Sequence, residues 1–160
     1  MLDGRYRMSR RVEKALEQLR QAGFKLTAQR STIIKYLVEN KMFPKHPTAD
    51  AIYNDLNAAG CSISRATVYN TLEALVSAHL VLAIDNNMDG KMHYDWFGTP
   101  HYHVICTNCG KIVDADNFAM QDLSQLAQAA TGFQISSYQV EVRGLCPDCQ
   151  KLLAQDQESK

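Results

Sequence analysis

Four of the five cysteines in this 160-residue chain form two Cys-x-x-Cys pairs, which constrain its fold more than any other feature. The first pair is Cys106 and Cys109, and the second is Cys146 and Cys149. Each pair lies on a tight turn that can direct two thiolates at one ion, and two such turns complete the closed tetrahedral site of structural zinc. A thioredoxin-like redox pair is the competing interpretation. Two pairs that bracket a small strand–helix–strand unit favour zinc, which would stabilise a lobe with a thin core.

The composition, 46% hydrophobic and 21% charged, is normal for a soluble globular protein. No apolar run approaches the ~20 residues that span a bilayer, and the first residues contain no apolar segment typical of a signal peptide. We therefore expect a cytoplasmic protein without membrane association, in which paired cysteines bind metal more often than they form disulfides. Cys61 stands apart from the pairs, and we expect it to be a small buried apolar residue.

The net charge is zero but unevenly distributed. Residues 1–80 hold 12 Lys and Arg against 7 Asp and Glu, whereas residues 81–160 hold 5 against 10. A basic front half and an acidic back half indicate that the front half meets a polyanion, although chance asymmetry is an alternative.

Apolar periodicity in the front half predicts four helices, each bounded by a capping residue or a glycine. The expected helices are residues 10–22, a second after Thr27, a third after Thr48 and a fourth, residues 65–79, after Ser64. Two strands, residues 80–84 and 91–96, then flank a turn-rich hairpin tip. This order favours a winged helix-turn-helix over a plain helical bundle.

In a helix-turn-helix the second helix of the pair enters the major groove of DNA, and here that helix would be residues 64–79. We expect Arg65, Tyr69 and Asn70 to contact the major groove, because their side chains can reach phosphates or base edges. Lys25 and Arg30 are candidates for phosphate or minor-groove contacts.

The back half has a mixed pattern. Short strands are expected at residues 102–105 and 111–113, and a helical stripe runs from Met120 to Ala130. Alternating residues 138–143 predict a half-buried strand, and the polar tail from residue 154 is expected to fray. The predicted fold class is α+β, with a winged-helix domain at residues 1–84, a hinge at 85–91 and a small α/β metal-binding domain at 92–160.

A second metal site is indicated by nitrogen and oxygen ligands. His101 and His103 alternate on a strand and face one side, which Asp95 and Asp114 could also reach. His46 lies far away in a Pro-rich loop, residues 41–47. Taken alone, His46 would be a surface residue and Asp114 a solvated charge. As a set, three imidazoles and two carboxylates suit Fe2+ or Mn2+ with room for another ligand, and Zn2+ could also enter.

The chain resembles the ferric uptake regulator (Fur) family over nearly its whole length, and within it the peroxide-sensing (PerR) branch. The matching segments are residues 26–30 (LTAQR), 46–50 (HPTAD), 64–72 (SRATVYNTL), 101–114 (with HYHVIC and CGKIVD) and the closing pair Cys146 and Cys149. The iron-sensing branch usually carries Glu where this chain has Asp114. His93 and His79 remain candidate secondary ligands, although His79 is more simply explained as a helix C-terminal residue.

The resemblance implies a homodimer, paired through its C-terminal domains, that represses transcription at a near-palindromic double-stranded DNA operator. A regulatory metal held by His46, Asp95, His101, His103 and Asp114 would clamp the two halves in the DNA-binding orientation. With Fe2+, peroxide would convert His46 or His101 to 2-oxo-histidine and release the DNA, whereas Mn2+ would support repression without sensing. The nearest alternative is an iron- or manganese-responsive Fur-type repressor that does not sense peroxide.

Two other classes remain open. A metalloenzyme could use the His/Asp cluster, but it would need a substrate pocket for which the sequence has no signature. A zinc-ribbon interaction module would lack the second metal. We expect a non-enzyme, because oxidation of a ligand histidine is a self-modification and not a turnover.

Overall fold

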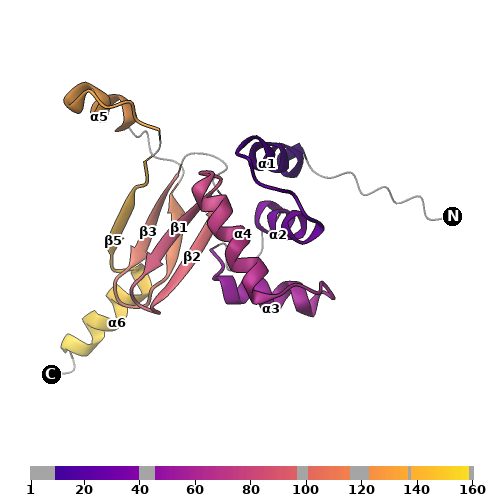
Figure 1. The fold of residues 1–160 in the computed structure, drawn as a ribbon. Helices are drawn as coiled ribbons and strands as arrows, with labels where there is room; N and C mark the ends of the chain where they lie inside the picture. The colour runs from indigo at the N-terminus through magenta and orange to yellow at the C-terminus, as the bar shows by residue number, and fades with distance from the viewer. Residues whose placement is uncertain (1–9, 40–45, 97–100, 116–122, 137, 159–160) are drawn as a thin grey trace. The chain divides into compact units, whose positions relative to one another are not determined.

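The computed structural model describes residues 10–39, 46–96, 101–115, 123–136 and 138–158, in six helices and five strands (Figure 1). These residues form two compact units. The first unit contains the described residues up to Ile84 and returns for residues 92–96; the second contains residues 85–91 and those from His101 onward. Residues 41–45 of the predicted Pro-rich loop, and Met120, lie outside the described residues. Every helix within the described ranges is too short or too polar to cross a lipid bilayer.

Four helices and most of a β-hairpin build the first unit. The elements are α1 (Arg10–Gln21), α2 (Ala28–Glu39), α3 (Ala49–Ala58), α4 (Arg65–Ser77), β1 (Val81–Asn86) and β2 (Lys91–Trp96). Helix α2 packs against α1, α3 and α4, and β1 pairs with β2. The apolar stripes of the helices meet in one core, in which Leu19, Ile33, Ile52, Leu72 and Leu75 are fully or almost fully buried.

Capping residues set the starts of the helices, as predicted. The Thr48 hydroxyl accepts a hydrogen bond from the Ala51 amide at 3.2 Å, and the Ser64 hydroxyl accepts one from the Thr67 amide at 3.1 Å. Both interactions satisfy backbone donors that the first helical turn leaves unpaired. Helix α4 ends at Ser77, two residues earlier than predicted, because His79 takes a left-handed conformation with φ 56° that no helix can continue.

The turn between α3 and α4 is held by one side chain. The Asn57 amide donates to the carbonyls of Tyr53 at 2.9 Å and Ile63 at 3.0 Å, and the Asn57 carbonyl accepts from the Ile63 amide at 3.4 Å. Ile63 is buried, so these contacts pair backbone groups in a segment with limited access to water. Asn57 therefore fixes the spacing between the two helices of the helix-turn-helix.

The second unit is a small sheet with two helices. Its elements are β3 (Tyr102–Cys106), β4 (Ile112–Ala115), α5 (Leu123–Thr131), β5 (Glu141–Gly144) and α6 (Pro147–Glu158). The strand order is β4-β3-β5, with β3 antiparallel to β4 and parallel to β5. The α+β prediction, with helices and a hairpin first and a small mixed unit second, is confirmed. Residues 85–91 group with the second unit by their contacts, and their role as a hinge stays a prediction.

Two expectations for the back half are wrong. The strand predicted as half-buried begins only at Glu141, and all four residues of β5 are exposed, Val142 by 44%. Alternating hydrophobicity indicates that one face of a strand is buried in the functional protein, but it does not show whether the same chain buries it. The tail expected to fray continues α6 as far as Glu158, because residues 151–158 are rich in Leu, Ala, Gln and Lys, which favour helix.

Replacing Asn57 with Ala is expected to destabilise the chain by about 1–3 kcal/mol, because buried backbone groups of the α3–α4 turn lose their partners. Urea denaturation followed by circular dichroism measures the effect. Asn54→Ala, at an exposed position of the same helix, is the control and should change the free energy of unfolding by less than about 0.5 kcal/mol. Equal stability of the two variants would contradict the role given to Asn57.

Candidate metal and DNA-binding sites

The four paired cysteines converge in the second unit. The sulfur atoms of Cys106, Cys109, Cys146 and Cys149 all lie within 4.8 Å of one another. The Cys109 and Cys146 sulfurs are 3.8 Å apart. Four thiolates at about 2.3 Å from a tetrahedral zinc ion lie about 3.8 Å from each other, so the arrangement fits that ion.

Strand pairing explains this convergence. In the parallel register of β3 and β5, Cys106 lies opposite Gly144, so both Cys-x-x-Cys turns leave the sheet at the same end. The first turn closes with a hydrogen bond from the Gly110 amide to the Cys106 carbonyl at 3.0 Å. Gly110 has φ 72°, and an added Cβ would lie 3.0 Å from atoms of Asn86 and Met88, so glycine is required here.

Hydrogen bonds and burial shift the pKa values of two of these thiols in opposite directions. The pKa of Cys106 is lowered to about 6 by backbone hydrogen bonds, first from Cys146, whose amide lies 3.3 Å from the sulfur, and then from Cys109 and Asn108. The Asn108 amide lowers the pKa of Cys149, but the hydrogen bond with Cys146, burial and the other thiols outweigh it and raise that pKa to about 12. Crowded sulfurs cannot all ionise without a neutralising cation, which a zinc ion would supply.

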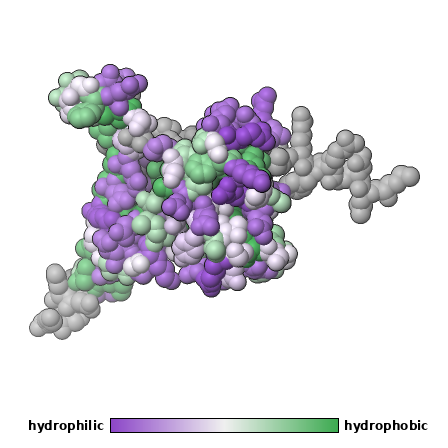
Figure 2. All heavy atoms as spheres, in the orientation of Figure 1, coloured by the Kyte–Doolittle hydropathy of each residue, from purple (hydrophilic) through white to green (hydrophobic). Residues whose placement is uncertain are grey.

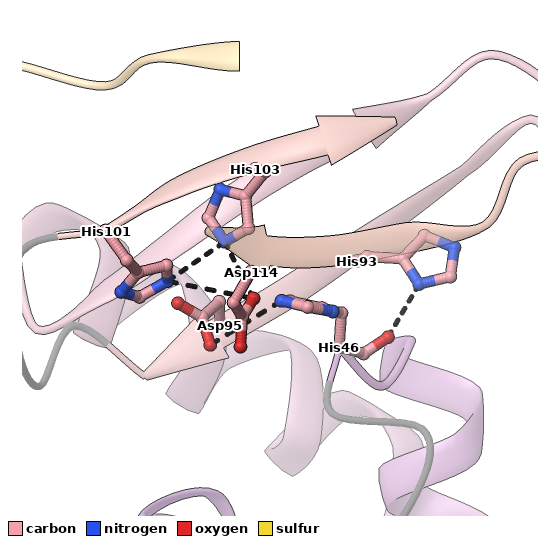
Figure 3. Close-up of polar contacts among 6 residues, drawn as sticks. All are labelled: His46, His93, Asp95, His101, His103 and Asp114. Carbon is pink, nitrogen blue, oxygen red and sulfur yellow. Dashed lines mark hydrogen bonds and ion pairs between the residues drawn. The ribbon is translucent and has the colours of Figure 1, made fainter. Parts of the chain in front are cut away.

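Three nitrogen and oxygen ligands also gather in the second unit, and we call His101, His103 and Asp114 the strand triad. His103 on β3 faces Asp114 on β4 directly in the antiparallel register, and His101 lies two residues before His103 on the same side. The two imidazole Nε2 atoms are 3.2 Å apart, and they lie 4.0 Å (His101) and 3.8 Å (His103) from Asp114 Oδ1 (Figure 3). Donors bound side by side at about 2.1 Å lie roughly 3 Å apart, so small adjustments suffice to hold one ion.

The first unit contains the other two candidate ligands, His46 and Asp95, which we call the loop pair. His46 Nε2 lies 3.9 Å from Asp95 Oδ1, and both side chains are buried (Figure 3). His46 immediately precedes Pro47 and the Thr48 cap of α3, whereas Asp95 lies near the end of β2. Each unit therefore brings its own candidate ligands together, three in one and two in the other.

The residues predicted to contact DNA lie mainly at the start of α4. Tyr69 is 50% exposed, and Asn70 and Arg65 are also exposed. The exposed Arg65 guanidinium pairs with the Asp50 carboxylate and lies 4.4 Å from the ring centroid of Tyr53.

The other two predicted DNA contacts are Lys25, in the segment before α2, and Arg30, in the first turn of α2. Lys25 is exposed, and Arg30 donates to the Lys25 carbonyl at 2.7 Å.

Two residues lie outside the candidate sites. Cys61 is partly buried and packs against the core, and His79 is exposed.

Three partners of these residues were missed at the level of sequence. Asp50 holds Arg65, and no local pattern could reveal this because it depends on how α3 packs against α4. Asn86 donates from the hairpin tip to the Gly110 carbonyl at 3.0 Å. His93 Nδ1 lies 2.6 Å from the His46 carbonyl. The spacing of His93 and Asp95 on one strand could have indicated a shared side, but not that contact.

The chain is similar to proteins of one known family. The family model described as "Ferric uptake regulator family" matches residues 21–143. The "Peroxide operon regulator" of Bacillus subtilis (strain 168) is 39% identical over 140 residues, covering 88% of this chain and 94% of that protein. The "Peroxide-responsive repressor PerR" of Staphylococcus aureus (strain Mu50 / ATCC 700699) is 37% identical over 139 residues, covering 87% and 91%.

Among solved structures, the ferric uptake regulator from Francisella tularensis with iron has a TM-score of 0.60 and 28% identity. It covers 80% of this chain, and 96% of that chain is matched. The matched family segment spans most of the sequence and includes the loop pair, the strand triad and the first cysteine pair. This chain belongs to the ferric uptake regulator family.

Proposed function

We propose that this protein is a metal-dependent DNA-binding repressor that senses hydrogen peroxide. One observation carries the proposal: five nitrogen and oxygen ligands are divided into a loop pair in the unit with the helix-turn-helix and a strand triad in the other unit. A single ion bound by both sets would fix one orientation of the units. A ligand that binds one orientation better shifts the population toward it, and here that orientation would be the one that binds DNA.

The two metal sites have different tasks in this proposal. Cys106, Cys109, Cys146 and Cys149 hold a structural Zn2+, because the four sulfurs leave no position for a further ligand. His46, Asp95, His101, His103 and Asp114 hold the regulatory ion. Imidazole and carboxylate ligands suit Fe2+ and Mn2+, whereas the thiolates favour zinc, so the donor atoms themselves separate the metals.

The second unit is the proposed dimerisation surface. Most of the large exposed apolar residues of the described chain belong to it: Val113, Leu126, Phe133, Tyr138, Val142, Leu145, Leu152 and Leu153. Helix α5 buries none of its described residues, and apolar patches are visible on it in Figure 2. Exposed apolar surface of this extent marks an interaction site, and a second copy of the chain would cover it.

In the dimer, two α4 helices would meet two half-sites of a near-palindromic operator. Arg65, Tyr69 and Asn70 would face the major groove, with Lys25 and Arg30 on the backbone or minor groove. A repressor acts where the DNA is, so the proposal places the protein in the cytoplasm.

Peroxide sensing is the finer part of the proposal, supported by the two relatives whose names describe a peroxide response. Fe2+, when bound, supplies the redox chemistry by which peroxide oxidises a neighbouring imidazole. Peroxide would transfer one oxygen atom to His46 or His101 and leave as water: the ring C–H would become C=O, its hydrogen would move to the unprotonated ring nitrogen, and that nitrogen could no longer bind the ion. The loop pair or the strand triad would then lose one ligand, and the ion would no longer hold the two units in the orientation that binds DNA. The protein modifies itself once and turns over no substrate, so we assign no enzymatic activity.

An iron- or manganese-responsive repressor without peroxide sensing is the second candidate. The ferric uptake regulator with iron supports it, because that relative shares the fold and 28% of its sequence with this chain. The two candidates differ only in the response of the iron-loaded form to peroxide.

Cys149→Ser is expected to abolish zinc binding, because a closed site with three thiolates loses affinity and leaves the thin core of the second unit without its cross-link. The loss of several kcal/mol should lower the Tm by more than about 10 °C. Metal analysis and calorimetry measure both effects. Cys61→Ser, at the cysteine outside the cluster, is the control and should keep one zinc per chain. Zinc retention in Cys149→Ser would contradict the assignment.

His46→Ala is expected to remove the metal dependence of DNA binding, since the ion would then contact mainly the second unit. Mn2+ should raise the operator affinity of the zinc-loaded wild type by about 5–150-fold, the usual range of coupling between sites, and leave that of the variant unchanged. Fluorescence anisotropy with a duplex selected by the Mn2+-loaded protein measures it. His79→Ala, an exposed histidine outside both ligand sets, should behave like the wild type. An undiminished Mn2+ effect in His46→Ala would refute the clamp.

Peroxide added to the Fe2+-loaded protein is expected to add one oxygen atom to His46 or His101 and to release the operator. Intact-mass measurement with peptide mapping detects the modification, and anisotropy on the same sample detects release. The Mn2+-loaded protein is the control and should stay unmodified and bound. DNA release without oxygen gain on either histidine would refute histidine oxidation as the route, whereas an operator that stays bound in the presence of peroxide would favour the second candidate function.

A further inference from the structure

His93 holds the backbone of a candidate metal ligand. Its Nδ1 atom lies 2.6 Å from the carbonyl oxygen of His46, within the first unit (Figure 3). A carbonyl oxygen can only accept a hydrogen bond, so Nδ1 must carry the proton and donate it. A ligating role for His93 would therefore have to use Nε2.

Backbone contacts strengthen this attachment. Thr48 and His93 form an isolated antiparallel bridge, and the Tyr94 amide donates to the Pro47 carbonyl at 3.0 Å. Pro47 has no N–H of its own to extend the ladder. The short pairing between residues 46–48 and β2 therefore has few backbone donors. The His93 ring adds one donor to it from a side chain.

The attachment determines the geometry of the loop pair. Asp95 lies two residues after His93 on β2, so the strand that binds the His46 carbonyl also carries the second ligand. Thr48 caps α3, so the same short segment leads directly into the helix-turn-helix. If residues 46–48 moved away from β2, the 3.9 Å separation of His46 Nε2 and Asp95 Oδ1 would no longer be set before a metal arrives.

We propose that His93 is a positioning residue for the regulatory metal: its Nδ1–H holds the His46 carbonyl, so that the His46 imidazole is kept beside Asp95 ready to bind the ion. His93 is not itself a ligand. The inference rests on the regulatory site proposed above. Partners that orient metal ligands through a hydrogen bond typically contribute 10–100-fold to metal affinity.

Three substitutions separate positioning from ligation. His93→Asn keeps an amide nitrogen at the place of Nδ1 and removes Nε2, whereas His93→Leu has similar bulk and no donor. His93→Gln keeps a nitrogen near the place of Nε2 and none at Nδ1. Mn2+ affinity of the full-length, zinc-loaded protein is measured by calorimetric titration, with zinc content and Tm recorded for each variant.

Positioning predicts that His93→Leu and His93→Gln bind Mn2+ about 10-fold or more weakly, with unchanged zinc content, and that His93→Asn stays within a few-fold of the wild type. If His93→Gln keeps full affinity and His93→Asn loses it, then Nε2 is a ligand and the proposal is overturned. If all three variants bind like the wild type, the hydrogen bond has no role. If His93→Leu fails to fold, the comparison of His93→Asn with His93→Gln still distinguishes positioning from ligation.

The same titrations test the regulatory site separately. His46→Ala should lose most of the Mn2+ affinity of the zinc-loaded wild type. If the wild type and His46→Ala bind Mn2+ equally, the regulatory site itself is misassigned, whatever the His93 variants do. If His46→Ala loses affinity and the His93 variants do not, only the positioning role fails.

Discussion

The attachment of residues 46–48 to β2 is the interaction on which the proposed control of this protein depends. The Thr48–His93 bridge and the bond from Tyr94 to the Pro47 carbonyl bring a ligand from the start of α3 to a ligand on the hairpin. Without it, His46 and Asp95 would be two distant residues of one chain. With it, the first unit presents a preformed pair of hard and borderline donors, and the entropy of bringing them together is lost during folding and not during metal binding.

The second unit has a small apolar core and a cluster of cysteines. Its described buried residues are few, and two of them are cysteines, so the apolar core contributes little. Four thiolates around the proposed zinc ion would compensate for the small core, at the end of the sheet where β3 and β5 finish side by side. The strand triad lies on the same sheet, where the register of β3 and β4 fixes His103 opposite Asp114. In the proposal, stability and sensing would therefore use one small sheet with different donor atoms.

Local chemistry in the sequence predicted most of this arrangement. Thr48 and Ser64 cap helices where expected, because N-capping depends only on neighbouring residues. The sulfurs of the two cysteine pairs lie together as predicted, because the Cys-x-x-Cys spacing is typical of zinc sites and the pairing of β3 with β5 brings both turns to one end of the sheet. The strand triad was accessible as well, since period-two alternation places His101 and His103 on one side.

The misses arose where packing or partners decide. Nothing near Arg65 in the sequence indicates that Asp50 and Tyr53 hold its guanidinium, because that contact follows from the packing of α3 on α4. The exposed β5 strand was predicted to be half-buried, because the hydrophobic pattern identifies an apolar face but not the element or chain that buries it. The contact of His93 with the His46 carbonyl was also missed, because spacing along a strand does not show which backbone group a side chain meets.

In the proposed mechanism one ion couples the two units and thereby controls DNA binding, and thermodynamic linkage tests this coupling most directly. Mn2+ affinity of the zinc-loaded protein would be measured with and without its selected operator duplex. Coupling is reciprocal, so the operator must raise Mn2+ affinity by the same factor by which Mn2+ raises operator affinity. We expect the two factors to be equal and both to vanish in His46→Ala. An Mn2+ affinity that is the same with and without the operator would contradict it.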